Sequence, residues 1–130
     1  MSSPLALIIE DDPDAAVIFS QALKVTGFAS EVIPSGTDAC NRLAHVQPSL
    51  VLLDMHLPQV AGTEILNYIR SSKRLAGTRV VIVSADARMA DSVAAQADLV
   101  LLKPISFSQV RDLVARLNVT IPPEPSDPSV

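Results

Sequence analysis

The sequence predicts a doubly wound α/β domain, a (βα)5 sandwich with a five-stranded parallel sheet of order 2-1-3-4-5 between helices on both faces. Five short apolar runs alternate with amphipathic segments of about ten to fifteen residues. Most runs are apolar throughout, as strands covered on both faces must be. The 130 residues fit one domain.

The five apolar runs are the predicted strands, and they cover residues 5–9, 29–33, 50–53, 80–83 and 99–102. Apolar residues make up 48% of the chain but aromatic ones only 3%, so the core must be almost wholly aliphatic. Parallel strands joined by helices take right-handed crossovers, and the switch point of such a sheet lies between its first and third strands.

Charge, hydropathy and cysteine content exclude several classes of protein. The net charge is −4 with no long basic run, which argues against direct binding of nucleic acid. The apolar runs are far shorter than the roughly 20 residues that a membrane-spanning helix needs. A single cysteine, Cys40, cannot form an internal disulfide, so we expect a cytoplasmic protein.

The first helix has clear start and stop signals. Asp12 is a good N-cap, Pro13 suits the first helical position, and Gly27 stands where the helix should end. Glu10 and Asp11, which come just before Asp12, stand at the end of the preceding strand.

The three middle helices are predicted from apolar spacing. The second begins at Ser35 or Thr37, and the third spans 61–75 and closes at Gly77. The fourth, over 87–97, carries few large apolar side chains, so we expect it to be the least firmly held. The inward residues expected of these helices are Ala39, Leu43, Val46, Ile65, Leu66, Ile69, Met89 and Val93.

The last helix begins near Ser106, and the domain is predicted to cover residues 1–119. Residues 120–130 are rich in proline and are predicted to be a disordered tail or the start of a linker. The apolar stripe expected of this helix consists of Phe107, Val110, Leu113, Val114 and Leu117.

Polar side chains follow four of the predicted strands. Glu10 and Asp11 follow the first, Asp54 the third, Ser84 the fourth and Lys103 the fifth. The carboxyl ends of parallel strands meet at one crevice, so these groups should converge. Clustered carboxylates favour a hard divalent cation such as Mg²⁺. A metal, a nucleophilic carboxylate, a hydroxyl and an ammonium together suit phosphoryl transfer.

Taken in order, these motifs resemble the receiver domain of two-component response regulators, a flavodoxin-like fold. They are the Glu10-Asp11 pair, Asp54-Met-His-Leu-Pro58 with Gly62, Ser84-Ala85 and Lys103-Pro104. The resemblance covers residues 5–117, which is nearly all of the predicted domain.

The resemblance implies a Mg²⁺ site. Asp11 matches the carboxylate that binds the metal directly, and Glu10 matches its partner, which acts through water. Asp54 and the backbone carbonyl of His56 fall where the family supplies further ligands. Asp12 has two interpretations, an N-cap or a group that touches the metal.

The resemblance also implies the groups that handle a phosphoryl group. Asp54 matches the phosphoacceptor, Ser84 the hydroxyl that moves to the phosphoryl oxygen, and Ala85 the small residue that leaves the site open. Lys103 matches the lysine that pairs with the phosphate, and its bond to Pro104 is expected to be cis.

A receiver of this kind would take its phosphoryl group from a histidine kinase or a phosphotransfer protein and control a downstream partner. It would catalyse only its own phosphorylation and slow autodephosphorylation, and it could form a homodimer. Two alternatives stay open. One is an interaction module of the same fold that is never phosphorylated. The other is a Mg²⁺-dependent phosphatase, although His56 stands where such enzymes commonly carry a second acid.

The sequence departs from the family in two places. Val100 stands where the family usually has the aromatic ring that turns inward on activation, and the stretch from Ser84 to Lys103 is short. Activation would then use an altered face or an order–disorder change in the fourth helix. The side chain of His56 is expected to be exposed at the rim of the site. Cys40, Met55 and Met89 are expected to serve in packing.

Overall fold

A computed structural model describes residues 3–120, and it confirms the predicted sheet. The strands are β1 (Leu5–Ile9), β2 (Ala29–Ile33), β3 (Leu50–Asp54), β4 (Arg79–Ser84) and β5 (Leu99–Leu102). All neighbouring pairs are parallel and the order is β2-β1-β3-β4-β5. The switch point therefore lies between β1 and β3, where the first strand has neighbours on both sides.

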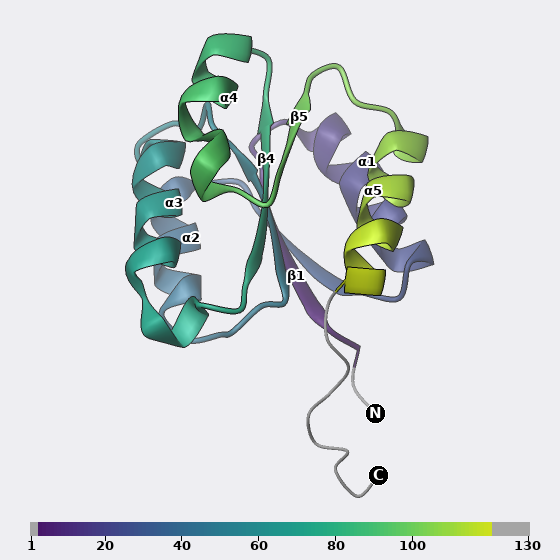
Figure 1. The fold of residues 1–130 in the computed structure, drawn as a ribbon, viewed down its shortest axis with the longest axis horizontal. Helices are drawn as coiled ribbons and strands as arrows, with labels where there is room; N and C mark the ends of the chain where they lie inside the picture. Colours follow the sequence, from purple (N-terminus) through teal and green to yellow (C-terminus); the bar gives the residue numbers. More distant parts are fainter. Residues whose placement is uncertain (1–2, 121–130) are drawn as a thin grey trace, which may run out of the picture.

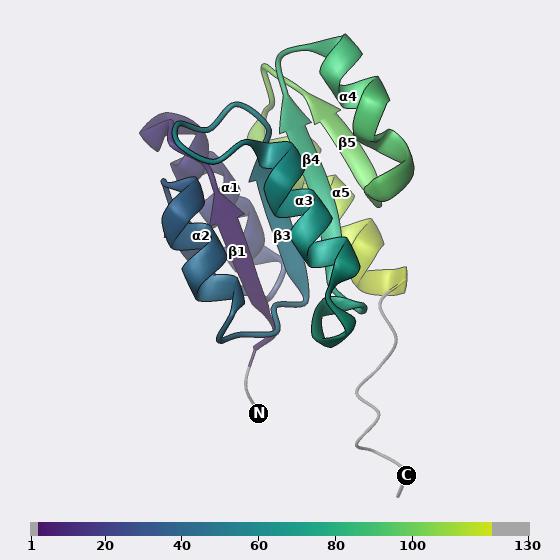
Figure 2. The ribbon, with the colours of Figure 1, turned by 90° about the vertical axis from the view of Figure 1, so that its left-hand side faces the viewer.

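Five α-helices cover the two faces of the sheet. They are α1 (Pro13–Val25), α2 (Gly36–Leu43), α3 (Gly62–Ser71), α4 (Ala87–Val93) and α5 (Phe107–Thr120). Helices α1 and α5 lie together on one face, while α2, α3 and α4 lie on the other (Figures 1 and 2). The result is a three-layer sandwich in which the sheet is the middle layer.

Two aliphatic clusters form the core, one on each face of the sheet. Alternate residues of β1 show the division: Ala6 and Ile8 pack with α1 and α5, whereas Leu7 and Ile9 pack with α2 and α3. The central strand β3 is buried along its whole length, whereas the edge strands β2 and β5 are partly exposed. The continuous apolar pattern thus predicts the central strands best.

The predicted boundaries of the first helix are confirmed. The Asp12 carboxylate accepts a hydrogen bond from the Asp14 N–H at 3.1 Å, and Pro13 is the first helical residue. The chain leaves the helix at Thr26, and Gly27 has φ +94°, which glycine adopts without the strain that other residues incur.

The three middle helices are shorter than predicted. Helix α2 ends at Leu43, so Val46 packs on the core from the following loop. Helix α3 ends at Ser71 because Ser72 is extended (φ −92°, ψ 120°), and a separate 3₁₀ turn follows at Lys73–Leu75. Helix α4 likewise gives way to a 3₁₀ turn at Ala94–Gln96.

The packing predictions are otherwise confirmed. The apolar stripe of α5 is buried at Val110, Leu113, Val114 and Leu117, with Phe107 partly buried. Met55 is buried, and Cys40 and Met89 pack against the same core at partial exposure.

The chain termini lie largely outside the described part of the chain. Of the predicted tail, residues 120–130, only Thr120 is described, as the end of α5. Between residues 3 and 120, no helix is both long and apolar enough to cross a membrane.

Candidate functional site

Strand pairing brings the predicted site residues to one edge of the sheet. Asp54 pairs with Val83 across β3 and β4, so it lies one step from Ser84. The Lys103 N–H donates to the Ser84 carbonyl oxygen at 2.8 Å, which places the lysine, just after β5, beside the end of β4. Glu10 follows directly on β1, which is the other neighbour of β3.

The Lys103 ammonium lies between two buried carboxylates. Its Nζ is 3.1 Å from Glu10 Oε1 and 3.3 Å from Oε2, and 3.5 Å from Asp54 Oδ2. Glu10 is 1% exposed and Asp54 is 3% exposed, whereas Lys103 is partly exposed. One cation therefore faces two carboxylates that water hardly reaches.

The pKa values follow from this crowding. Burial, together with hydrogen bonding to Asp54 and repulsion from it, raises the pKa of Glu10 to about 7 against the smaller opposing effects of the Asp12 N–H and Lys103. Burial by itself would lower the pKa of Lys103, but Glu10 and Asp54 outweigh it and the net shift is upward. Lys103 therefore stays charged, whereas Glu10 is only partly ionised near neutral pH.

These residues fit a divalent cation. Glu10, Asp11 and Asp54 each offer a carboxylate oxygen, and the three oxygens lie within 4.8 Å of one another. Glu10 Oε1 is buried and accepts no hydrogen bond from the described residues, although the Lys103 ammonium is near. A hard cation that prefers oxygen ligands, such as Mg²⁺, would satisfy that oxygen and relieve the repulsion.

Asp54 is held in a fixed orientation by its neighbours. Its Oδ1 accepts a hydrogen bond from the His56 backbone N–H at 3.0 Å, and its Oδ2 faces Lys103. The imidazole of His56 is exposed, as predicted for the rim of the site. Each oxygen of the Asp54 carboxylate thus has a neighbour that fixes its direction.

Ser84 is fully buried, and its hydroxyl is bonded to the chain that follows. Its Oγ accepts from the Asp86 N–H at 2.9 Å and donates to the Asp86 carbonyl at 3.2 Å. Asp86 also caps α4 by accepting from the N–H groups of Arg88 and Met89. The hydroxyl at the end of β4 is therefore tied to the start of α4.

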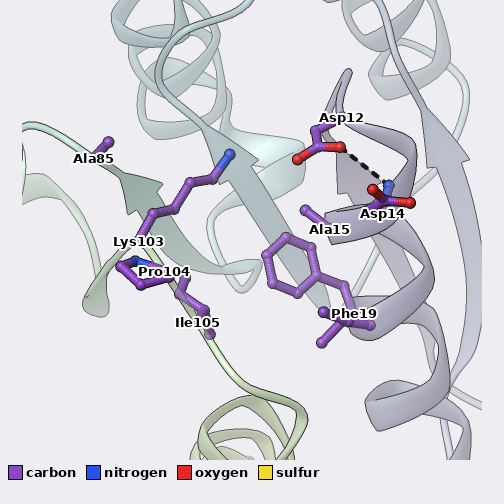
Figure 3. Close-up of a pocket in the computed structure, with 9 residues that line it drawn as sticks. Asp12, Asp14, Ala15, Phe19, Ala85, Lys103, Pro104 and Ile105 are labelled. Carbon is purple, nitrogen blue, oxygen red and sulfur yellow. Dashed lines mark hydrogen bonds between the residues drawn. The ribbon is translucent and has the colours of Figure 1, made fainter.

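A cavity of about 400 Å³ opens beside Lys103, between the start of α1 and the segment after β5 (Figure 3). Ala85 and Asp12 stand on its rim, and Asp12 is bonded to its own helix, outside the group of three carboxylates. The structure thus favours the N-cap interpretation of Asp12. The lining residues are Asp12, Asp14, Ala15, Ile18, Phe19, Ala85, Lys103, Pro104 and Ile105.

Two contacts in the site were not predicted from the sequence. The imidazole Nε2 of His56 lies 3.4 Å from Ser84 Oγ, and Asp86 binds the same hydroxyl. An aspartate two residues after a strand and just before a helix is an N-cap signal that could have identified Asp86. No local pattern relates His56 to Ser84, since they are far apart in sequence. The peptide bond between Lys103 and Pro104 is cis, as expected.

Comparison with known proteins identifies the same family along most of the chain. The family model of the response regulator receiver domain matches residues 6–115. The DNA-binding response regulator MtrA of Mycolicibacterium smegmatis is 29% identical over 126 residues, which is 95% of this chain and 53% of MtrA. The transcriptional regulatory protein PrrA of Mycobacterium leprae is 27% identical over 124 residues, 93% of this chain and 51% of PrrA. The chain thus spans about half the length of these curated relatives.

Solved structures agree in fold. The CheY-like receiver domain from Methylobacillus flagellatus superposes with a TM-score of 0.78 at 26% identity, covering 89% of this chain and 99% of that one. The receiver domain of the sensor histidine kinase PA1611 from Pseudomonas aeruginosa PAO1 has a magnesium ion coordinated in its active-site cleft. It superposes with a TM-score of 0.78 over 88% of this chain and 97% of its own, and at 19% identity the likeness is one of fold.

Proposed function

Since this chain belongs to the response regulator receiver family, we propose that it accepts a phosphoryl group on Asp54, with Mg²⁺, from a histidine kinase or phosphotransfer protein. The observation that carries the proposal is the setting of Asp54. It is a buried carboxylate with one oxygen held by the His56 N–H and the other facing the Lys103 ammonium. Members of this family are signalling domains, and here the phosphoryl group would be the signal.

The transfer itself needs little covalent chemistry from the protein. A carboxylate oxygen of Asp54 attacks phosphorus, the new O–P bond forms, and the P–N bond of the donor phosphohistidine breaks with its electron pair staying on nitrogen. The acyl phosphate remains on Asp54 until water hydrolyses it. Catalysis in such transfers is mainly positioning and neutralisation of charge.

Glu10, Asp11, Asp54 and the backbone carbonyl of His56 would hold the Mg²⁺. When bound, the cation supplies charge neutralisation for the carboxylates and the incoming phosphoryl oxygens. Lys103 supplies the second positive charge, because its Nζ already lies near Asp54. Ala85 is small and exposed at the mouth of the site, so it would leave access for the donor.

Phosphorylation would then bias a two-state equilibrium. We propose that Ser84 moves its hydroxyl from Asp86 to a phosphoryl oxygen, and that a partner protein recognises the altered surface around α4. The curated relatives are named for DNA binding or transcriptional regulation, and this chain spans about half of their length. With a net charge of −4, the receiver would act through a protein partner rather than by touching DNA.

The test is chemical phosphorylation. With Mg²⁺ and acetyl phosphate or phosphoramidate, intact-mass analysis should show the gain of one phosphoryl group, and Asp54→Asn should abolish it. Asp91→Asn is the matched control, because Asp91 is an exposed aspartate on α4 and should leave the labelling intact. Labelling that survives Asp54→Asn would contradict the assignment.

The same preparation separates the two alternatives. If a calorimetric titration with Mg²⁺ gives no binding and no label appears, the chain is an interaction module with the receiver fold. Repeated turnover of small phosphate esters would identify a phosphatase instead.

A further inference from the structure

The hydroxyl of Ser84 has a third partner besides the two atoms of Asp86. The imidazole Nε2 of His56 lies 3.4 Å from Ser84 Oγ, within hydrogen-bond reach. His56 belongs to the segment after β3, whereas Ser84 ends β4, so the contact joins two elements across the mouth of the site. The imidazole is exposed while the hydroxyl that it meets is fully buried.

Three contacts surround the Ser84 hydroxyl, and the tautomer of His56 decides how they share its bonding capacity. A serine hydroxyl has one hydrogen to donate and two lone pairs that accept. The Asp86 N–H occupies one lone pair at 2.9 Å, and the Asp86 carbonyl lies 3.2 Å away as an acceptor for the hydrogen. His56 Nε2 then either donates to the second lone pair or competes for the hydrogen, depending on its tautomer. In the first case the bonding capacity of the hydroxyl is filled, and in the second the imidazole offers its hydrogen an alternative acceptor to the Asp86 carbonyl.

His56 thus acts on two groups of the site through two different atoms. Its backbone N–H donates to Asp54 Oδ1 at 3.0 Å, and its side chain meets Ser84. A substitution at position 56 keeps the backbone N–H and removes only the imidazole. The contribution of the Ser84 contact can therefore be separated from the orientation of Asp54.

We propose that the His56 imidazole is a positioning group that holds the Ser84 hydroxyl in its unphosphorylated place and so sets how readily the receiver switches. The proposal rests on the function proposed above, in which Ser84 must turn toward a phosphoryl oxygen. That turn requires the hydroxyl to leave both Asp86 and His56. Removing the imidazole removes one of the bonds that oppose the turn, so the switched state becomes easier to reach.

The test is a double-substitution cycle read out by binding of beryllofluoride, a phosphoryl analogue, at saturating Mg²⁺. His56→Ala should tighten the apparent affinity about two- to fivefold, the effect of losing one weak neutral hydrogen bond from the resting state. In a Ser84→Ala background the same substitution should change nothing, because the hydroxyl that it restrains is gone. His56→Gln, whose side-chain amide can replace Nε2, should return the affinity toward that of the wild type.

His45→Ala is the control, since His45 is an exposed histidine in the turn after α2 and should leave the affinity unchanged. An effect of His56→Ala that is equal in the wild-type and Ser84→Ala backgrounds, or absent in both, would overturn the proposal. The failure of the proposed function looks different. In that case the wild type would bind no beryllofluoride and would take no phosphoryl group on Asp54.

Discussion

Asp98, just before β5, shows how one carboxylate can organise several backbone segments remote from the site. It accepts a hydrogen bond from the Val80 N–H at 2.7 Å and from Arg70 at 2.9 Å, and it lies 3.4 Å from an Arg79 nitrogen. Arg70 in turn donates to the carbonyl oxygens of Gln96 and Thr78. Burial alone would raise the pKa of Asp98, but the Val80 N–H and the two arginines outweigh it and lower that pKa.

The lowered pKa predicts how acid should act on Asp98→Asn. A carboxyl group with a lower pKa in the folded state adds stability above its unfolded value of about 4, and loses it as the pH falls through the folded value. At pH 7 the substitution should lower the free energy of unfolding by about 1–3 kcal/mol. Urea unfolding should show the gap to the wild type closing between about pH 4 and lower values. A difference in the free energy of unfolding that stays constant with pH would mean that the charge of Asp98 adds no stability.

The site residues divide into those that sequence could predict and those that it could not. Glu10, Asp54 and Lys103 each follow an apolar run, and the rule that parallel strands end together is enough to bring them into one place. The contact of His56 with Ser84 depends on a side-chain direction after β3, and neither apolar period nor spacing encodes it.

At the scale of elements, strands were predicted better than helix ends. Each predicted run became a strand, and for the central strands β1, β3 and β4 burial on both faces explains the continuous apolar pattern. Helix ends depend on distant partners. Arg74, in the 3₁₀ turn after α3, donates to the carbonyl oxygens of Leu43 and Val46 around the end of α2. An arginine far along the chain satisfies these carbonyl groups, so the residues next to them give no stop signal.

Helix α4 should be the least protected helix. It has seven residues and buries only Ala90 and Val93, both small, whereas the 13-residue α1 buries Phe19 and Leu23 among others. Its N-cap, Asp86, is the residue that also holds Ser84. Amide hydrogen exchange should therefore be fastest here among the helices, and Mg²⁺ with beryllofluoride should change protection in 87–93 more than in α1. Protection equal to that of α1, unaltered by the analogue, would exclude an order–disorder change in α4.

Val100 also bears on how the receiver would be activated. It is partly buried against the cluster on the α2, α3 and α4 face, as an ordinary aliphatic packing residue. The ring that the family usually has at this position is absent, and Asp86 joins Ser84 to the start of α4, so we expect α4 to respond to a movement of Ser84.

At the scale of the whole molecule, the residues that carry the proposed function lie together at one edge of the sheet, where their charges also affect the stability of the fold. The interior consists of two aliphatic clusters, whereas the carboxyl edge holds Glu10 and Asp54 buried beside the Lys103 ammonium. Burial, followed by hydrogen bonding to Asp54 and repulsion from it, raises the pKa of Glu10 to about 7, so an ionised Glu10 beside Asp54 is disfavoured there. We therefore expect the site to lower the stability of the fold when no cation is bound.

Asp54→Asn should consequently stabilise the protein when divalent cations are removed. At pH 8 with EDTA, we expect the free energy of unfolding in urea to rise by about 0.5–2 kcal/mol, because the substitution removes the charge that opposes Glu10. Adding Mg²⁺ should reverse the difference. A cation at a hundred times its Kd adds about 2.7 kcal/mol to the wild type, while the variant has lost a ligand and gains less. Asp91→Asn should follow the wild type in both buffers. If Asp54→Asn is destabilised in EDTA, repulsion between the carboxylates does not limit stability at this edge. If Mg²⁺ stabilises both proteins equally, Asp54 does not share in binding the cation.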